Sequence, residues 1–157
     1  MITTVAHPGS QASRDLDCLF VHVPKAHNHY LPFGDFMNIC YMPMGLPAIA
    51  EWVRRHGHAT EIVHLGVEWI RDKTYDIVED FDGATLGAIG VTLYWHYQSY
   101  DSVEVARALK RSHPEAFVFL GGVTAAYFAT EILETFPEID AVIPGHGEGP
   151  TLALLQE

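Results

Sequence analysis

The chain has 157 residues, of which 48% are hydrophobic and 18% are charged, so its length and composition fit one globular domain and exclude a disordered chain. Nine Lys and Arg stand against 20 Asp and Glu, which gives a formal net charge of −11. This acidic balance argues against nucleic acid and against an anionic membrane surface as partners, because both require a basic face.

The cysteine content and the lack of long apolar segments favour a cytoplasmic protein. Cys18 and Cys40 do not form the pattern of a disulfide framework, so we expect reduced thiols. The N-terminus lacks the apolar core of a signal peptide. No apolar run approaches the roughly 20 residues that a membrane span needs.

Elements in the first half alternate between strand and helix patterns. In order, we expect a flexible lead-in at 1–16, a strand at 17–23, a long aromatic loop at 24–43, a helix at 45–56, a strand at 60–65 and a helical or mixed segment at 67–81. Pro47 suits the first turn of the helix, and Gly57 is a natural stop after it. Because long loops inside compact domains are usually functional, the loop is a candidate cover or interface.

The second half continues the alternation. The patterns predict a strand at 86–95, a helix at 98–112, a strand at 116–120, a helix at 125–136 and a strand at 140–143. Continuous apolar strands between helices predict a parallel sheet covered on both faces. The fold class expected is therefore α/β: a flavodoxin-like, Rossmann-like sheet of five parallel strands with its ligand site at the carboxyl edge.

Two glycine-rich turns follow the last two predicted strands. Gly121 and Gly122 end the fourth strand, and Gly145, Gly147 and Gly149 follow the fifth. Because the carboxyl ends of parallel strands lie along one edge, we expect these turns to lie side by side. Backbone without Cβ atoms would there form a shelf for a large flat ligand.

The end of the third strand offers polar and aromatic groups to the same edge. Thr92 and Tyr94 should point to one side, because strand residues two apart share a face. His96 is more simply a hydrogen-bonding residue at a strand end. Thr92 and Tyr94 are therefore candidate ligand contacts.

Other motifs are absent or are better explained structurally. Neither G-x-G-x-x-G after the first strand nor G-x-x-x-x-G-K-[ST] occurs. His27 and His29 have a spacing that suits no closed zinc pattern, and no cysteine pair lies nearby. No metal ligand and no catalytic residue is predicted in this chain.

Four short segments carry a resemblance to a known family. In order they read Met-Pro-Met-Gly-Leu-Pro-Ala-Ile-Ala-Glu-Trp-Val, Ile-Gly-Val-Thr-Leu-Tyr-Trp, Phe-Leu-Gly-Gly-Val-Thr-Ala and Asp-Ala-Val-Ile-Pro-Gly-His-Gly-Glu-Gly-Pro. This series resembles the N-terminal cobalamin (B12)-binding domain of B12-dependent radical S-adenosylmethionine proteins, over roughly residues 17–157. The resemblance implies that the corrin lies at the carboxyl edge of the sheet and that the nucleotide tail of cobalamin enters near the third and fourth strands.

The resemblance also implies which residues contact cobalamin. Thr92 and Leu93 match a Ser/Thr-Leu element, Gly121 and Gly122 match a double glycine, and Gly145 begins a Gly-x-Gly-Glu element. The expected cofactor contacts are Thr92, Leu93, Tyr94, Gly121, Gly122, Val123, Gly145, Gly147 and Glu148.

The chain departs from related patterns at two points. Methionine synthase-type domains place Asp-x-His-x-x-Gly after the first strand, but this chain has Pro-Lys-Ala-His-Asn-His-Tyr there, so a His-ligated cobalt is not implied. The Cys-x-x-x-Cys-x-x-Cys loop of an iron–sulfur cluster is missing as well. The cluster and S-adenosylmethionine are expected only in a missing downstream radical domain of the same polypeptide, with 17–150 as the cobalamin-binding domain and 151–157 as the start of a linker or helix toward it.

On this interpretation the chain is a cofactor-binding module that does not catalyse a reaction alone. Two alternatives remain open. One is the same fold without cofactor, serving as an interaction scaffold. The other is a different flavodoxin-like domain, such as a flavin protein or a receiver domain.

Overall fold

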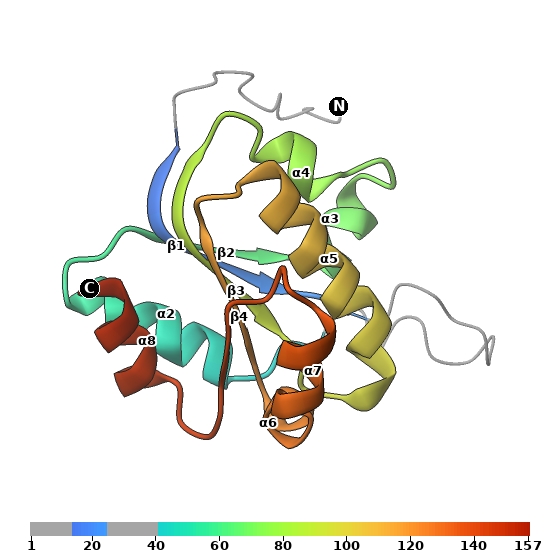
Figure 1. The fold of residues 1–157 in the computed structure, drawn as a ribbon. Helices are drawn as coiled ribbons and strands as arrows, with labels where there is room; N and C mark the ends of the chain where they lie inside the picture. The colour runs from blue at the N-terminus through green and yellow to red at the C-terminus, as the bar shows by residue number, and fades with distance from the viewer. Residues whose placement is uncertain (1–13, 25–40) are drawn as a thin grey trace, which may run out of the picture.

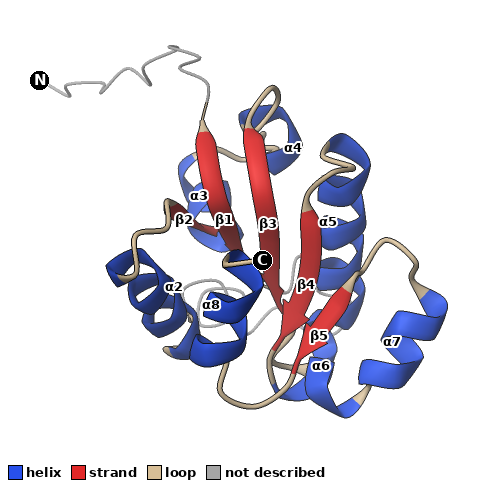
Figure 2. Ribbon diagram, turned by 60° about the vertical axis from the view of Figure 1, so that its left-hand side comes forward, coloured by secondary structure: helices blue, strands red, loops and turns tan. Residues whose placement is uncertain are grey.

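A computed structural model describes residues 14–24 and 41–157 of the chain. Five parallel strands form one sheet in the order β2-β1-β3-β4-β5, with helices on both faces (Figures 1 and 2). This is the flavodoxin-like order, so the predicted fold class is confirmed. Most of the expected lead-in at 1–16 and of the expected loop at 24–43 lies outside the described residues.

The strands and helices follow the predicted alternation. The strands are β1 Asp15–His22, β2 Thr60–His64, β3 Thr85–Thr92, β4 Phe117–Gly121 and β5 Ala141–Ile143. The helices are α2 Gly45–Arg55, α3 Leu65–Arg71, α4 Ile77–Asp80, α5 Ser99–Ser112, α6 Val123–Tyr127, α7 Ala129–Thr135 and α8 Glu148–Leu155, with a short 3-10 helix, η1, at His96–Gln98. None of the described helices is long and apolar enough to cross a membrane.

The predicted helix at 125–136 is two helices in the structure. It breaks at Phe128, whose backbone leaves the helical region with φ −105° and ψ 25°. Ala125 and Ile132 still face one core, so the apolar pattern gives no sign of the break. The segment at 67–81 likewise holds two short helices, capped by the side chains of His64 and Asp76.

Two apolar layers hold the sheet between its helices. On one face, Leu46, Ala50 and Val53 of α2 pack against strand residues such as Phe20 and Phe119. The other face carries the larger core, formed with α3, α4, α5, α6 and α7. The last helix, α8, packs beside α2 on the first face (Figure 2). The predicted domain boundary at residue 150 therefore falls inside α8.

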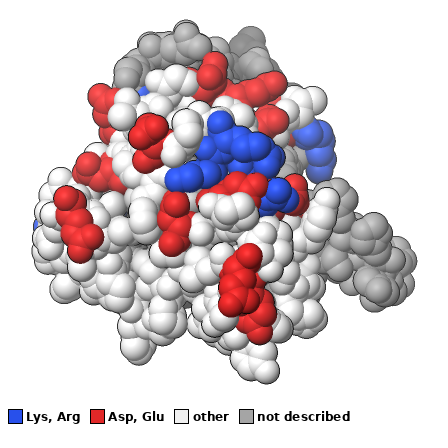
Figure 3. All heavy atoms as spheres, in the orientation of Figure 1, with Lys and Arg blue, Asp and Glu red and all other residues white. Residues whose placement is uncertain are grey.

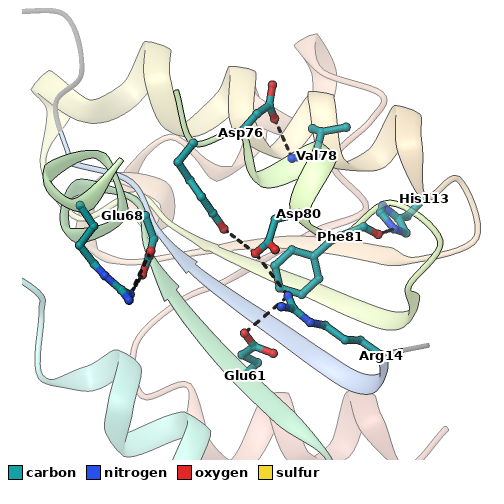
Figure 4. Close-up of polar contacts among 10 residues, drawn as sticks. Arg14, Glu61, Glu68, Asp76, Val78, Asp80, Phe81 and His113 are labelled. Atoms are coloured by element: carbon teal, nitrogen blue, oxygen red, sulfur yellow. Dashed lines mark hydrogen bonds and ion pairs between the residues drawn. The ribbon is translucent and has the colours of Figure 1, made fainter. Parts of the chain in front are cut away.

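Polar contacts tie the elements together at the amino end of the sheet. Arg14 lies 3.3 Å from Asp80 and 3.9 Å from Glu61, and its guanidinium lies 4.8 Å from the centre of the Phe81 ring (Figure 4). His113 contacts the Phe81 carbonyl at 3.1 Å. These contacts anchor β1 and α4 at the end of the sheet opposite the predicted site.

Charged side chains gather over α5 in the view of Figure 3. There Arg107 pairs with Glu138 at 2.9 Å, and Lys110 pairs with Asp140 at 2.9 Å. The lower end of the same view, around α6, shows few charged side chains. The carboxyl edge is therefore the less charged end of the molecule in this view.

Candidate functional site

A mainly apolar cavity of about 340 Å³ lies at the carboxyl ends of the central strands, between the sheet and the pair α2 and α8. Phe20, Gly90 and Phe119 line it from the strands, and Leu46 and Ile49 line it from α2. No charged side chain among the described residues lines it. Such a cavity accepts a neutral, largely apolar group.

Gly90 makes room for the aromatic side chains that form the cavity floor. A Cβ at Gly90 would lie 2.5 Å from Phe119 Cζ and 3.1 Å from Phe20 Cδ1. The two rings meet edge to face, with their centroids 6.4 Å apart. The position of the Phe119 ring therefore depends on the missing side chain at Gly90.

The first glycine turn contacts the backbone that follows β3. Gly122 has φ +119°, and a Cβ there would lie 2.6 Å from the Leu93 carbonyl oxygen. The Leu93 N–H donates to the Gly121 carbonyl at 2.8 Å, and the Ala125 N–H donates to the Leu93 carbonyl at 3.1 Å. Only glycine fits this position, so part of the double glycine has a purely structural reason.

Gly121 differs from its neighbour. A Cβ at Gly121 would meet no atom within 4 Å, although Gly121 also lines the cavity. The fold therefore does not require a glycine there, whereas the open cavity leaves space for a ligand close to the backbone.

The second glycine turn reaches the same cavity. Gly145 has φ +72° and open space where a Cβ would lie, and a Cβ at Gly147 would lie 2.5 Å from Ile49 Cδ1. Gly121, Gly122, Gly145 and Gly147 all line the one cavity. The structure thus brings the two turns together, as the strand order predicts.

The structure gathers seven of the nine expected contacts around this cavity. They are Thr92, Tyr94, Gly121, Gly122, Val123, Gly145 and Gly147. Leu93 does not line it, because strand alternation turns its side chain into the core on the opposite face. Glu148 starts α8 and is also absent from the lining.

His22, which no motif in the sequence marks, contacts the side chain of Thr92. His22 is fully buried at the end of β1, and its Nδ1 lies 2.9 Å from Thr92 Oγ1. The ring of His64 lies 4.6 Å from the His22 ring. Burial, and then the neighbouring His64, lowers the pKa of His22 to about 4, so the imidazole is neutral at neutral pH.

The pKa of His64 is shifted in the same direction as that of His22. Burial lowers its pKa, and its Nδ1 accepts a hydrogen bond from the Val67 N–H at 3.3 Å. Among the described residues, no group of three or more His, Cys, Asp or Glu side chains is placed to hold a metal ion. The histidine pair is therefore a support for Thr92 and α3.

The chain matches a known protein family. A family model described as the B12 binding domain matches residues 38–155, most of the chain. The chain belongs to the B12-binding domain family.

Two curated relatives resemble this B12-binding domain. A hopanoid C-3 methylase of Methylococcus capsulatus is 29% identical over 115 residues, which are 73% of this chain and 22% of the relative. An uncharacterized methyltransferase of Pyrococcus horikoshii is 28% identical over 106 residues, 68% of this chain and 22% of the relative. The chain thus spans about a fifth of the length of these proteins, and no solved structure matches it significantly.

The cavity suits a B12-binding domain. The bare backbone at Gly121 and Gly145 leaves space beside the strand ends, and aromatic and aliphatic side chains line the hollow. One buried hydroxyl of the lining, Thr151 Oγ1, has no hydrogen-bond partner. The open backbone and the apolar lining fit a ligand that buries apolar surface at the strand ends.

The two adjacent glycines should respond differently to alanine. We predict that Gly122→Ala lowers the free energy of unfolding by at least about 2 kcal/mol, since it places a side chain at positive φ and against the Leu93 carbonyl. Gly121→Ala, the matched control, should change it by less than about 0.5 kcal/mol. Urea unfolding measures both, and equal stability of the two variants would contradict the turn geometry.

The pKa of His22 predicts a stability that falls in mild acid. In the unfolded chain His22 takes up a proton near pH 6.5, whereas in the folded protein it does so only near pH 4. The contribution of His22 to the free energy of unfolding is therefore fully present above about pH 6.5 and declines as the pH falls from there to about 4. His22 alone contributes a slope of up to about 1.4 kcal/mol per pH unit.

His22→Asn should remove the part of the slope that is due to His22. Urea unfolding between pH 4.5 and 7.5 compares the two proteins. If the variant keeps the full slope, the buried neutral imidazole is not its source.

Proposed function

We propose that this chain holds cobalamin at the carboxyl edge of its sheet and serves as the cofactor-binding module of a larger B12-dependent radical S-adenosylmethionine enzyme. The observation that carries the proposal is the single cavity that both glycine turns line, in a chain of the B12-binding domain family. The position of the cavity at the carboxyl ends of parallel strands is the usual ligand position in such sheets.

The volume of the cavity limits which part of cobalamin can enter it. A cavity of about 340 Å³ is at the lower end of the range for small-molecule sites, too small for a corrin with its nucleotide. We therefore assign the nucleotide tail to the cavity and the corrin to its mouth. Val123, an exposed residue of the lining, offers apolar surface for a flat macrocycle, and the exposed Trp95 and Tyr127 directly follow the lining residues Tyr94 and Ala126 in the chain.

Within this module the chain's residues bind and orient. The glycine turns allow close approach, Phe20 and Phe119 form the floor, and His22 fixes the Thr92 hydroxyl at the cavity wall. Cobalamin, when bound, would act as the methyl carrier or radical partner in the reaction. Leu93 orders the turns through its backbone, and Glu148 remains a proposed contact at the start of α8.

The parent enzyme is proposed from the relatives of this chain. The chain spans about a fifth of their length, and we place the iron–sulfur cluster and S-adenosylmethionine in an adjoining domain of such a longer polypeptide. The methylase and methyltransferase names of the relatives support methyl transfer as its reaction. A cytoplasmic location agrees with Cys18, a free thiol buried in β1. A coding sequence that continues past Glu157 into the cluster loop would support this assignment, and a coding sequence without one would contradict it.

Cobalamin retention tests the site directly. The purified protein, incubated with hydroxocobalamin and passed through a desalting column, should keep a corrin absorption band. Gly121→Leu should abolish retention because the new side chain enters the cavity without meeting protein atoms at its Cβ.

Gly149→Leu is the matched control. Gly149 also has open space at its Cβ but does not line the cavity, so this variant should retain the cofactor. A wild-type protein that keeps no corrin band would overturn the proposal and favour a scaffold role for the fold.

A further inference from the structure

The helix α5 presents a stripe of side chains with opposite charges toward its two ends. Tyr100, Glu104, Ala108 and Arg111 recur every three or four residues, so they lie along one face of the helix. Tyr100 is 71% exposed, and Arg111 is exposed as well. Figure 3 shows that side chains of both signs gather over this helix. The stripe therefore runs from an aromatic ring and a carboxylate, past a small residue, to a guanidinium.

A groove of about 420 Å³ lies beside this stripe, between α5 and the pair α3 and α4. Trp69, Ile77 and Val105 line it, together with all four residues of the stripe. It is on the face of the sheet that carries the larger core, whereas α2, α8 and the cavity of the glycine turns are on the other face. This surface is thus separate from the proposed cobalamin site.

The fold pairs some charges of α5 more completely than others. Lys110 is held in an ion pair with another element. Arg107 is shared between Glu104, at 2.8 Å, and Glu138, at 2.9 Å. Arg111 takes no part in these ion pairs, and the side chain of Glu104 is 41% exposed. A carboxylate with only a share of one arginine, and an exposed guanidinium, therefore face outward on the same stripe.

Such a stripe is complementary to itself when two copies meet antiparallel. Glu104 and Arg111 are seven residues apart, about two helical turns, and Ala108 lies between them. A two-fold axis beside Ala108 places Glu104 of each copy opposite Arg111 of the other, and the small alanine lets the helices approach. Tyr100, one turn before Glu104, then lies beside the same guanidinium, where an aromatic ring attracts a cation.

We propose that two copies of this chain associate through α5 in an antiparallel pair, in which the contact between Glu104 and Arg111 is made twice. A second copy fits because the charges reverse along the stripe, as a two-fold interface requires. The net charge of −11 on each copy opposes association. At about 0.15 M salt this repulsion is screened beyond roughly 8 Å, so we expect a weak dimer with a Kd of roughly 10–100 µM.

Sedimentation velocity of the purified protein across roughly this concentration range tests the dimer. Arg111→Glu and Glu104→Arg should each weaken dimerisation at least about tenfold, because like charges then face each other at both contacts. A mixture of the two variants should dimerise with nearly the wild-type affinity, since both contacts of the mixed pair again join opposite charges. This rescue is specific to the antiparallel arrangement.

Arg55→Glu is the matched control. Arg55 is an exposed arginine of α2, on the other face of the sheet, and its reversal also breaks an exposed ion pair, with Glu51 at 2.9 Å. This variant should dimerise like the wild type. The Tm of each variant reports whether it folds, and exposed ion pairs contribute little to it. Arg111→Gln, which removes the charge without reversing it, is a milder second variant and should weaken the dimer less than Arg111→Glu does.

Three results would overturn the antiparallel pair: a wild-type protein that stays monomeric at about 500 µM, a mixture of the two reversed variants that stays monomeric, or a loss of dimerisation in Arg55→Glu. Cobalamin retention should be the same in all of these variants, since α5 lies away from the cavity. The dimer and the proposed cobalamin binding therefore stand or fall separately.

Discussion

The contact between the backbone of Gly122 and the Leu93 carbonyl is the constraint on which this site depends. It brings the turn after β4 against the turn after β3, where a side chain would keep them apart. Hydrogen bonds on both sides, from Leu93 to Gly121 and from Ala125 to Leu93, fix the contact. α6 begins directly after this turn, at Val123, and the Cβ position of Gly121 faces open space.

The two ends of the sheet serve different purposes. Ion pairs of Arg14 join elements at the amino end of the sheet, which is opposite the cavity. At the carboxyl end, α2 and α8 pack on each other, and Gly147 allows Ile49 to approach the second turn. Two helices far apart in the sequence, α2 and α8, thus close the cavity that the central strands open. Thr151 of α8, in the segment predicted as the start of a linker or helix, is part of this wall.

Much of the fold follows from local pattern, and less of the site does. Alternating apolar strands and helices lead to the observed strand order, and the glycine turns lead to the correct edge. Because side chains alternate along a strand, Thr92 faces the cavity and Leu93 faces the core. The family motif, in contrast, suggests both residues as cofactor contacts. His22 and Thr92 are 70 residues apart, and their contact exists only once β1 and β3 pair. Thr151 looks like an ordinary helix residue until burial shows that its hydroxyl has no partner.

The contact between Gly90 and the Phe119 ring makes the floor of the cavity sensitive to a single substitution. The Phe119 ring occupies the volume that any side chain at Gly90 would fill. Alanine at that position would force the far end of the phenyl ring to move, because its Cβ would lie 2.5 Å from Phe119 Cζ. A single substitution in a central strand would thus reshape the floor of the cavity, which Phe20, Gly90 and Phe119 line together.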